Sequence, residues 1–185
     1  EFVGARGRVV ALSDVADAWH IPICRLICVA DSDFNSLSGN GISRRRLLWT
    51  DYPSLESYAL LPRAFQKFAD FVGRGDAAGE GEIRHLLDTW QLLFVVRSLV
   101  EGRDSYRLSN SVYKTCFPKR GKSVVDVGRL ADKVTPSLGK EMRKQLMSEA
   151  RLILDRLGAP SLHHVRGHDI APSLVSFWNL GSQYS

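Results

Sequence analysis

The sequence has little of what secreted and membrane-spanning proteins need. Only three of its 185 residues are cysteines (Cys24, Cys28 and Cys116), and this odd number does not suggest a disulfide framework. No apolar run approaches the roughly 20 residues that cross a bilayer. We therefore expect reduced cysteines, no membrane partner and a cytoplasmic protein.

The composition is otherwise that of a globular protein. Hydrophobic residues make up 44% of the chain and charged residues 24%, and the length suits one domain, or one domain with a small lobe. The net charge of +5 favours an anionic partner such as nucleic acid. Many basic domains are merely soluble, so charge alone leaves both interpretations open.

Strand signals are confined to the first part of the chain. The run 23–30 is nearly continuously apolar and rich in branched residues, which predicts a central parallel strand covered on both faces. A shorter second strand is expected within 42–50. We predict a helix over 9–19, preceded by the turn "GARG", and a loop at "NSLSGNG" between the strands.

Helical periodicity dominates after Pro53. Pro62 is expected to separate two helices, and Gly158 to end a later one. The further helices are expected at 82–100, 124–136, 137–158 and the end of the tail 163–180. The chain is thus predicted to be α/β, with a small, mostly parallel sheet followed by a helical part. The expected units are an α/β core over 1–60, a helical lobe over 61–160 and a segment over 161–185 that returns to the core.

Two acids follow the first predicted strand, in the motif "ADSDFN". In an open α/β sheet, ligands bind beyond the carboxyl ends of the strands, which is where Asp31 and Asp33 are expected. Neighbouring carboxylates repel unless a cation lies between them, and Mg²⁺ or Mn²⁺ prefers oxygen ligands. Such an ion activates water and stabilises phosphoryl transition states. The alternative is that both are ordinary turn residues.

A second pair of acids follows the second strand. Asp51 comes directly after it, and Glu56 lies near the start of the next helix. Acids at the ends of adjacent strands converge on one ion, so the predicted metal ligands are Asp31, Asp33 and Asp51, with Glu56 completing the site. A helix macrodipole also favours an acid at the position of Glu56, without any function.

The remaining candidates are basic or lie in the tail. His168 and Asp169, in "RGHDI", form a pair that can orient a general base or contact phosphate, although Asp169 also suits a helix cap. Arg44, Arg45 and Arg46 form the basic run nearest the acids in sequence, and we expect them to hold a phosphate backbone.

Taken in order, the motifs resemble a known family. "RLICVADSDFN", "RRRLLWTDYPSLESYALLP", "LDTWQLLFVVRSLV" and "VRGHDI" together are similar to a TOPRIM-related domain found with ABC-type or OLD-type ATPases in phage-defence loci, which includes the PARIS effector nuclease. The resemblance covers most of the chain and implies Mg²⁺-dependent cutting of phosphodiesters. It matches three motifs to residues here: D-x-D to Asp31 and Asp33, T-D-x-x-x-x-E to Asp51 and Glu56, and G-H-D to His168 and Asp169.

One family feature is not found. The TOPRIM glutamate normally lies in an "E-G" motif on an earlier strand, whereas Glu1 is followed by Phe2. The chain is therefore either a fragment without that strand and helix or a divergent member. "GARGRVVAL" resembles the family's Gly-rich turn into a helix.

We expect a metal-dependent TOPRIM-like nuclease of a bacterial anti-phage defence system, with four catalytic residues: Asp31, Asp33, Glu56 and His168. The alternative is a non-catalytic module that docks on a partner ATPase. Haloacid-dehalogenase-like phosphatases and nucleotide-sugar transferases also use D-x-D. The former usually continue with Gly-Thr, where this chain has Phe34-Asn35, and the latter are longer.

Overall fold

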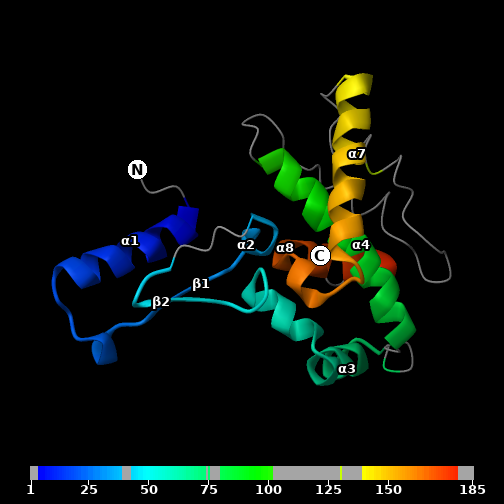
Figure 1. Ribbon diagram of the computed structural model, residues 1–185. Coiled ribbons are helices and arrows are strands. Elements are labelled where there is room, and N and C mark those ends of the chain that lie inside the picture. The colour runs from blue at the N-terminus through cyan, green and yellow to red at the C-terminus, as the bar shows by residue number, and fades with distance from the viewer. Residues whose placement is uncertain are drawn as a thin grey trace.

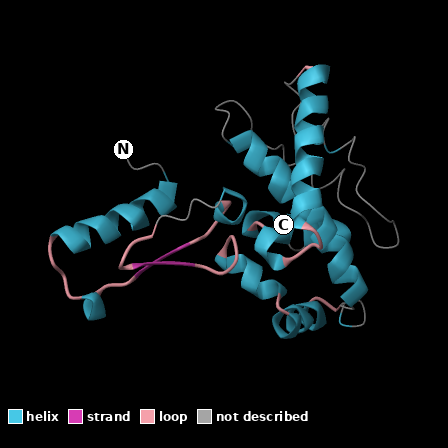
Figure 2. Ribbon diagram, viewed as in Figure 1, coloured by secondary structure: helices cyan, strands magenta, loops and turns pink. Residues whose placement is uncertain are grey.

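The computed structural model describes residues 4–38, 43–73, 75, 80–101, 130 and 139–178. It shows a mixed α/β protein that is mostly helical and has one small parallel sheet (Figures 1 and 2). In chain order, its elements are helix α1 (Gly4–Ala18), 3₁₀ helix η1 (Ile23–Arg25), strand β1 (Cys28–Ala30), helix α2 (Asn35–Ser38), strand β2 (Leu47–Trp49), 3₁₀ helix η2 (Leu55–Leu60), helices α3 (Pro62–Phe71), α4 (Glu80–Glu101) and α7 (Lys140–Leu157), 3₁₀ helix η4 (Leu162–His164) and helix α8 (Gly167–Phe177).

The sheet consists of β1 and β2, which pair in parallel from Cys28 opposite Leu47 to Ala30 opposite Trp49. Helix α1 packs against β1, and the two lie side by side in Figure 1. The small core between them contains the buried Cys28, Ala30 and Leu47, with partly buried neighbours Val9, Val10, Leu26 and Trp49. In the described part of the connection between the strands, the chain forms the four-residue helix α2.

The opposite face of the sheet is apolar and exposed. Val29 and Leu48 are partners in the register, and they keep 54% and 56% of their surface accessible. Parallel sheets are normally covered on both faces, and the same was expected of β1. That expectation is wrong for the residues that the structure describes, in which β1 shows a buried–exposed–buried pattern.

Several element boundaries differ from the prediction. The run 23–30 begins as η1 and becomes a strand only at Cys28, because apolar character over a short run does not determine the backbone conformation. The segment "GARG" is helical, since α1 begins at Gly4. The segment "NSLSGNG" includes the short helix α2, and its last residues lie outside the described part.

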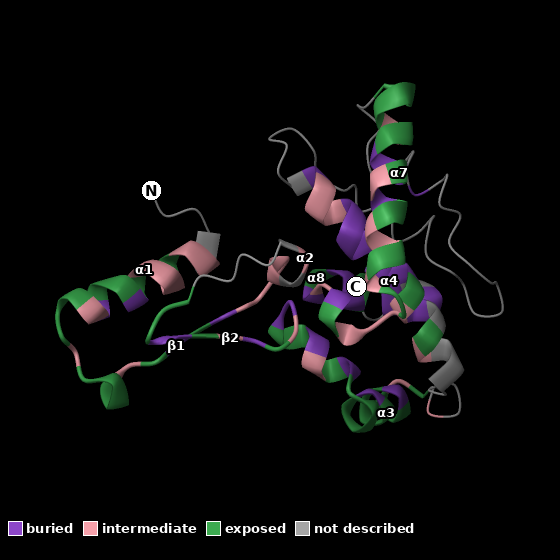
Figure 3. Cartoon of the chain, viewed as in Figure 1, coloured by how far each residue is buried: buried purple, intermediate pink, exposed green. Residues whose placement is uncertain are grey.

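The helical part is organised around α4. Its central residues 90–96 are all buried, and α7 packs along it (Figure 3). Two predicted boundaries are confirmed. Pro62 is the first residue of α3, where its missing N–H is harmless. Gly158 follows α7 with a φ of +70°, and its N–H donates to the Leu154 carbonyl oxygen at 3.1 Å.

The hydrophobic core of this part joins distant segments of the chain. It includes Leu60 and Phe65, the buried face of α4, and Ile170 and Leu174 of α8. The predicted division at residues 60 and 160 stays a prediction. The helix expected at 124–136 lies outside the described residues except for Leu130, which is buried. None of the described helices combines the length and the apolar composition needed to cross a membrane.

Candidate metal site

The loops that follow the two strands are joined by hydrogen bonds at the carboxyl end of the sheet. The Ser32 N–H donates to Thr50 Oγ1 at 3.0 Å, and the Asp33 N–H donates to the Pro53 carbonyl oxygen at 3.0 Å. These bonds satisfy backbone groups that the sheet leaves unpaired. They hold the D-x-D loop against the chain that leads into η2.

Asp31 lies in a crowded acidic environment. Its carboxylate accepts a hydrogen bond from the Leu55 N–H at the start of η2. Burial raises the pKa of Asp31 above its ordinary value of 3.8, and the nearby carboxylates of Glu56 and Asp33 raise this pKa further. The Leu55 hydrogen bond and His168 act in the opposite direction. The charges of three other predicted catalytic residues, Asp33, Glu56 and His168, therefore act on Asp31.

Glu56 lies directly over the first residue of α8. A Cβ atom placed on Gly167 would lie 2.7 Å from the Glu56 carboxyl carbon and would also overlap the Ser54 hydroxyl. Only glycine allows this approach. His168, the next residue of α8, is exposed, and its charge acts on Asp31. We call Asp31, Asp33 and Glu56 the acidic cluster.

Asp51, a predicted metal ligand, has different partners. Its carboxylate Oδ2 accepts a hydrogen bond from the Tyr58 hydroxyl at 3.3 Å, and its carbonyl oxygen accepts one from His163 Nδ1 at 2.9 Å. The Tyr52 ring packs on both Tyr58 and His163. These contacts make Asp51 part of a polar and aromatic group that fixes the loop after β2.

Asp169 is buried and paired with an arginine of α4. Arg97 contacts it in a two-point arrangement, Nη2 to Oδ1 at 2.6 Å and Nε to Oδ2 at 2.9 Å. Such planar pairs are among the stronger charge-assisted hydrogen bonds. The carboxylate therefore anchors the start of α8 to α4, which positions Gly167 and His168.

The three predicted phosphate-binding arginines lie at the other end of the sheet. Arg46 is 4% exposed, ion-paired with Asp17 and hydrogen-bonded to the Ile21 carbonyl oxygen, so it holds α1 against the sheet. Arg44 pairs with Asp14 at 2.6 Å, and Arg45 is exposed. These arginines precede β2 whereas the acids follow the strands, which separates them by about 10 Å of strand.

Two other arginines lie closer to the acidic cluster. Arg6 Nη1 is 3.5 Å from Asp33 Oδ2, and the Arg166 guanidinium lies 5.7 Å from the centre of the Phe34 ring. Sequence reasoning missed both residues. Arg6 lies in the segment expected to be a turn. Arg166 directly precedes the G-H-D motif, and this position was the only feature of the sequence that pointed to a role for it.

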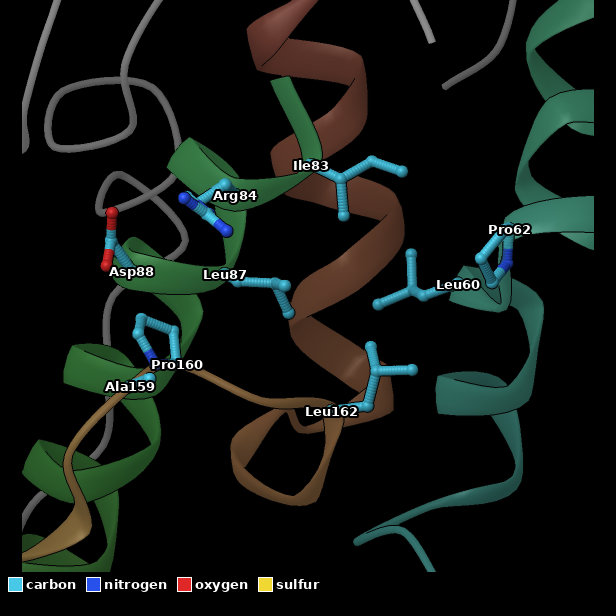
Figure 4. Close-up of a pocket in the computed structure, with 9 residues that line it drawn as sticks. All are labelled: Leu60, Pro62, Ile83, Arg84, Leu87, Asp88, Ala159, Pro160 and Leu162. Carbon is cyan, nitrogen blue, oxygen red and sulfur yellow. The ribbon is translucent and has the colours of Figure 1, made fainter. Parts of the chain in front are cut away.

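A separate cavity of about 780 Å³ lies in the helical part. Figure 4 shows the side chains of Leu60, Leu87 and Leu162 directed toward it from η2, α4 and η4. Arg84 and Asp88 of α4 add charge to its lining. The cavity is mainly apolar, in contrast to the acidic cluster.

The acidic cluster has donors that suit a hard cation. Among the described residues, no group of three or more His, Cys, Asp or Glu side chains is arranged to hold a metal ion. Mg²⁺ commonly keeps several waters and binds through one or two carboxylates together with substrate phosphates. The Asp31–Glu56 pair, with Asp33 beside it, fits this pattern.

Comparison of the chain with protein-family models, curated proteins and solved structures finds no match.

Proposed function

We propose that this chain is a metal-dependent, TOPRIM-like nuclease domain of a bacterial anti-phage defence system. The observation that carries the proposal is the convergence of the acidic cluster with His168 at the carboxyl end of a parallel sheet. These residues come from the loop after β1, from η2 and from α8. Ligand sites of open α/β sheets lie at this end.

In this proposal each residue has a chemical role. The carboxylates of Asp31 and Glu56, with Asp33 beside them, would hold Mg²⁺ or Mn²⁺ together with water and substrate phosphates, and the charge of the ion would offset their mutual repulsion. The ion supplies Lewis-acid stabilisation of phosphoryl oxygens and an acidified water. His168 is exposed next to Gly167 and would move a proton to or from the reacting oxygen. Arg166 contributes positive charge for the phosphate.

The decisive experiment replaces both aspartates of the D-x-D motif. The double variant Asp31→Ala with Asp33→Ala is expected to lose Mg²⁺ binding in calorimetry and at least about a hundredfold in cleavage rate. Cleavage is measured on plasmid DNA, single-stranded DNA and tRNA. Asp51→Asn is the matched control, and it should keep most of both properties because Asp51 contacts Tyr58. A double variant that is folded and cuts as well as the parent rules the proposal out.

Gly167→Ala tests the contact between α8 and the acidic cluster. The new methyl group must displace the Glu56 carboxylate, so Mg²⁺ affinity is expected to fall about tenfold while the unfolding free energy falls by about 1 kcal/mol. Calorimetry and urea denaturation measure the two effects. At Gly139 a Cβ would meet no atom within 4 Å, so Gly139→Ala should leave Mg²⁺ affinity unchanged. Equal affinities in the two variants would show that Glu56 is not a ligand.

A second candidate function is the non-catalytic docking module, with the partner ATPase that the resemblance implies. Two observations favour it: the apolar cavity of Figure 4 and the exposed sheet face with Val29 and Leu48. Both are surfaces on which a protein partner can bury apolar groups. A folded parent chain that shows no binding heat with Mg²⁺ or Mn²⁺ would favour this function over the nuclease.

A further inference from the structure

A second cavity, of about 350 Å³, lies where the end of α1 leads into η1, next to the residues that precede β2. Arg45 and Arg46 line it from the chain before β2, and Asp17 and His20 line it from the end of α1. Apolar residues 21–23 complete the lining. The volume is at the lower end for cavities that bind small molecules, so this one suits a small ligand.

Arg46 brings buried hydrogen-bond donors to this cavity. Its side chain is 4% exposed, its Nε is paired with Asp17, and its Nη2 donates to the Ile21 carbonyl oxygen. Its Nη1 is buried and has no hydrogen-bond partner among the described residues. A buried charged donor without an acceptor is costly. The unpaired Nη1 therefore indicates that an acceptor belongs here that the described part of the chain does not supply.

Two further side chains bring donors to the same cavity. His20 has a φ of +52°, and it ends α1 in a Schellman motif: its N–H donates to the Asp17 carbonyl oxygen at 3.1 Å, and the Ile21 N–H donates to the Ala16 carbonyl oxygen at 3.0 Å. Glycine usually occupies this left-handed position, so a histidine is held there at a conformational cost. Arg45 is exposed and adds a second guanidinium.

We infer that this cavity binds the phosphate group of a small molecule, either inorganic phosphate or a phosphate monoester. Arginine N–H groups form short, charge-assisted hydrogen bonds with phosphate oxygens. A monoester presents three unsubstituted oxygens, enough for separate donors on Arg45, Arg46 and His20. Asp17 is paired with Arg46, so Arg45 leaves the lining with an excess of positive charge. The inference is independent of the proposed nuclease function, because the cavity shares no residue with the acidic cluster.

The first experiment compares three probes: inorganic phosphate, adenosine 5′-monophosphate and adenosine. Binding is followed by calorimetry and by the shift in melting temperature, with chloride keeping the ionic strength constant. Phosphate and the monophosphate are expected to bind saturably, and adenosine at least about tenfold more weakly than the monophosphate. Tighter binding of the monophosphate than of phosphate would identify a monoester as the ligand. Adenosine that binds as well as the monophosphate, or no saturable binding of either phosphate compound, overturns the inference.

Variants separate the cavity from the general positive charge of the protein. Arg45→Gln is expected to weaken phosphate binding about fivefold or more. Arg8→Gln removes the same charge from an exposed position of α1 and should leave the affinity within about a factor of two. Arg46→Lys keeps the charge but lacks Nη1, and a folded Arg46→Lys protein should bind phosphate about tenfold more weakly.

His20→Gly distinguishes a binding role from a structural one. Glycine is favoured in the left-handed position, so the melting temperature without phosphate is expected to rise. The phosphate affinity should nevertheless fall about two- to threefold, because the imidazole donor is lost. Equal phosphate affinities in the parent, Arg45→Gln and His20→Gly would show that phosphate binds elsewhere.

Discussion

Asp31→Asn is expected to stabilise the folded protein at neutral pH and, under the proposed nuclease function, to abolish cleavage. The substitution removes a charge that is disfavoured by burial and by the carboxylates of Glu56 and Asp33, while the amide oxygen still accepts the Leu55 N–H. We expect the unfolding free energy in urea to rise by about 0.5–1 kcal/mol, a modest gain because the carboxylate is partly solvated. Cleavage should fall about a hundredfold or more.

The pH dependence of this gain has a defined sign. Because the folded state raises the pKa of Asp31, the folded protein binds this proton more tightly than the unfolded chain does. The contribution to stability is present below the ordinary value of 3.8 and is lost as the pH rises through the folded pKa. The difference in unfolding free energy between Asp31→Asn and the parent should therefore grow as the pH rises from 3.8 through the folded pKa of Asp31, and it should stay constant at higher pH.

Two controls make this result specific. Asp51→Asn removes an exposed carboxylate and should change the unfolding free energy by less than about 0.5 kcal/mol. Saturating Mg²⁺ should stabilise the parent but not Asp31→Asn, because a cation that binds the folded state shifts unfolding by mass action. An Asp31→Asn protein that is less stable than the parent at neutral pH would mean that Arg6 or His168 already neutralises the cluster.

Much of the helical part was predictable because its signals are local. The apolar pattern of α4, Pro62 at the start of α3 and Gly158 after α7 each act within a few residues. The strands were less predictable. A short apolar run is equally compatible with a buried strand, a 3₁₀ turn or an edge strand, and only tertiary packing decides among them.

The site shows the same distinction. Asp31, Asp33 and Glu56 were predicted to converge because acids that follow adjacent parallel strands lie at one edge of the sheet, whereas His168 was added only through the resemblance. The roles of the arginines were not predictable in this way. Arg46 pairs with Asp17 and Arg6 with Asp33, and both contacts join residues distant in sequence that leave no periodic pattern. The sequence offers a charge at these positions, and the fold decides what that charge neutralises.

Breaking the Arg97–Asp169 pair is expected to cause the largest loss of stability. Asp169→Ala leaves the largely buried Arg97 without this counter-ion and should lower the unfolding free energy by about 3–5 kcal/mol in urea denaturation. The apolar double variant Arg97→Met with Asp169→Leu should recover most of the loss, since well-packed hydrophobic residues often replace a buried ion pair at little cost. The exposed pair Glu141–Lys144 is the control, and Glu141→Gln should cost less than about 0.5 kcal/mol.

The consequence for function follows from where this pair lies. Asp169 is two residues after Gly167 and adjacent to His168, so a loosened α8 moves both relative to Glu56. The double variant should therefore be nearly as stable as the parent and yet bind Mg²⁺ more weakly, because apolar packing does not reproduce the two-point geometry that orients α8. Restored stability together with unchanged Mg²⁺ affinity would show instead that η2 positions Glu56 without the Arg97–Asp169 pair. In that case the hydrogen bond from the Ser57 hydroxyl to the Val165 carbonyl oxygen would connect η2 to the segment before α8.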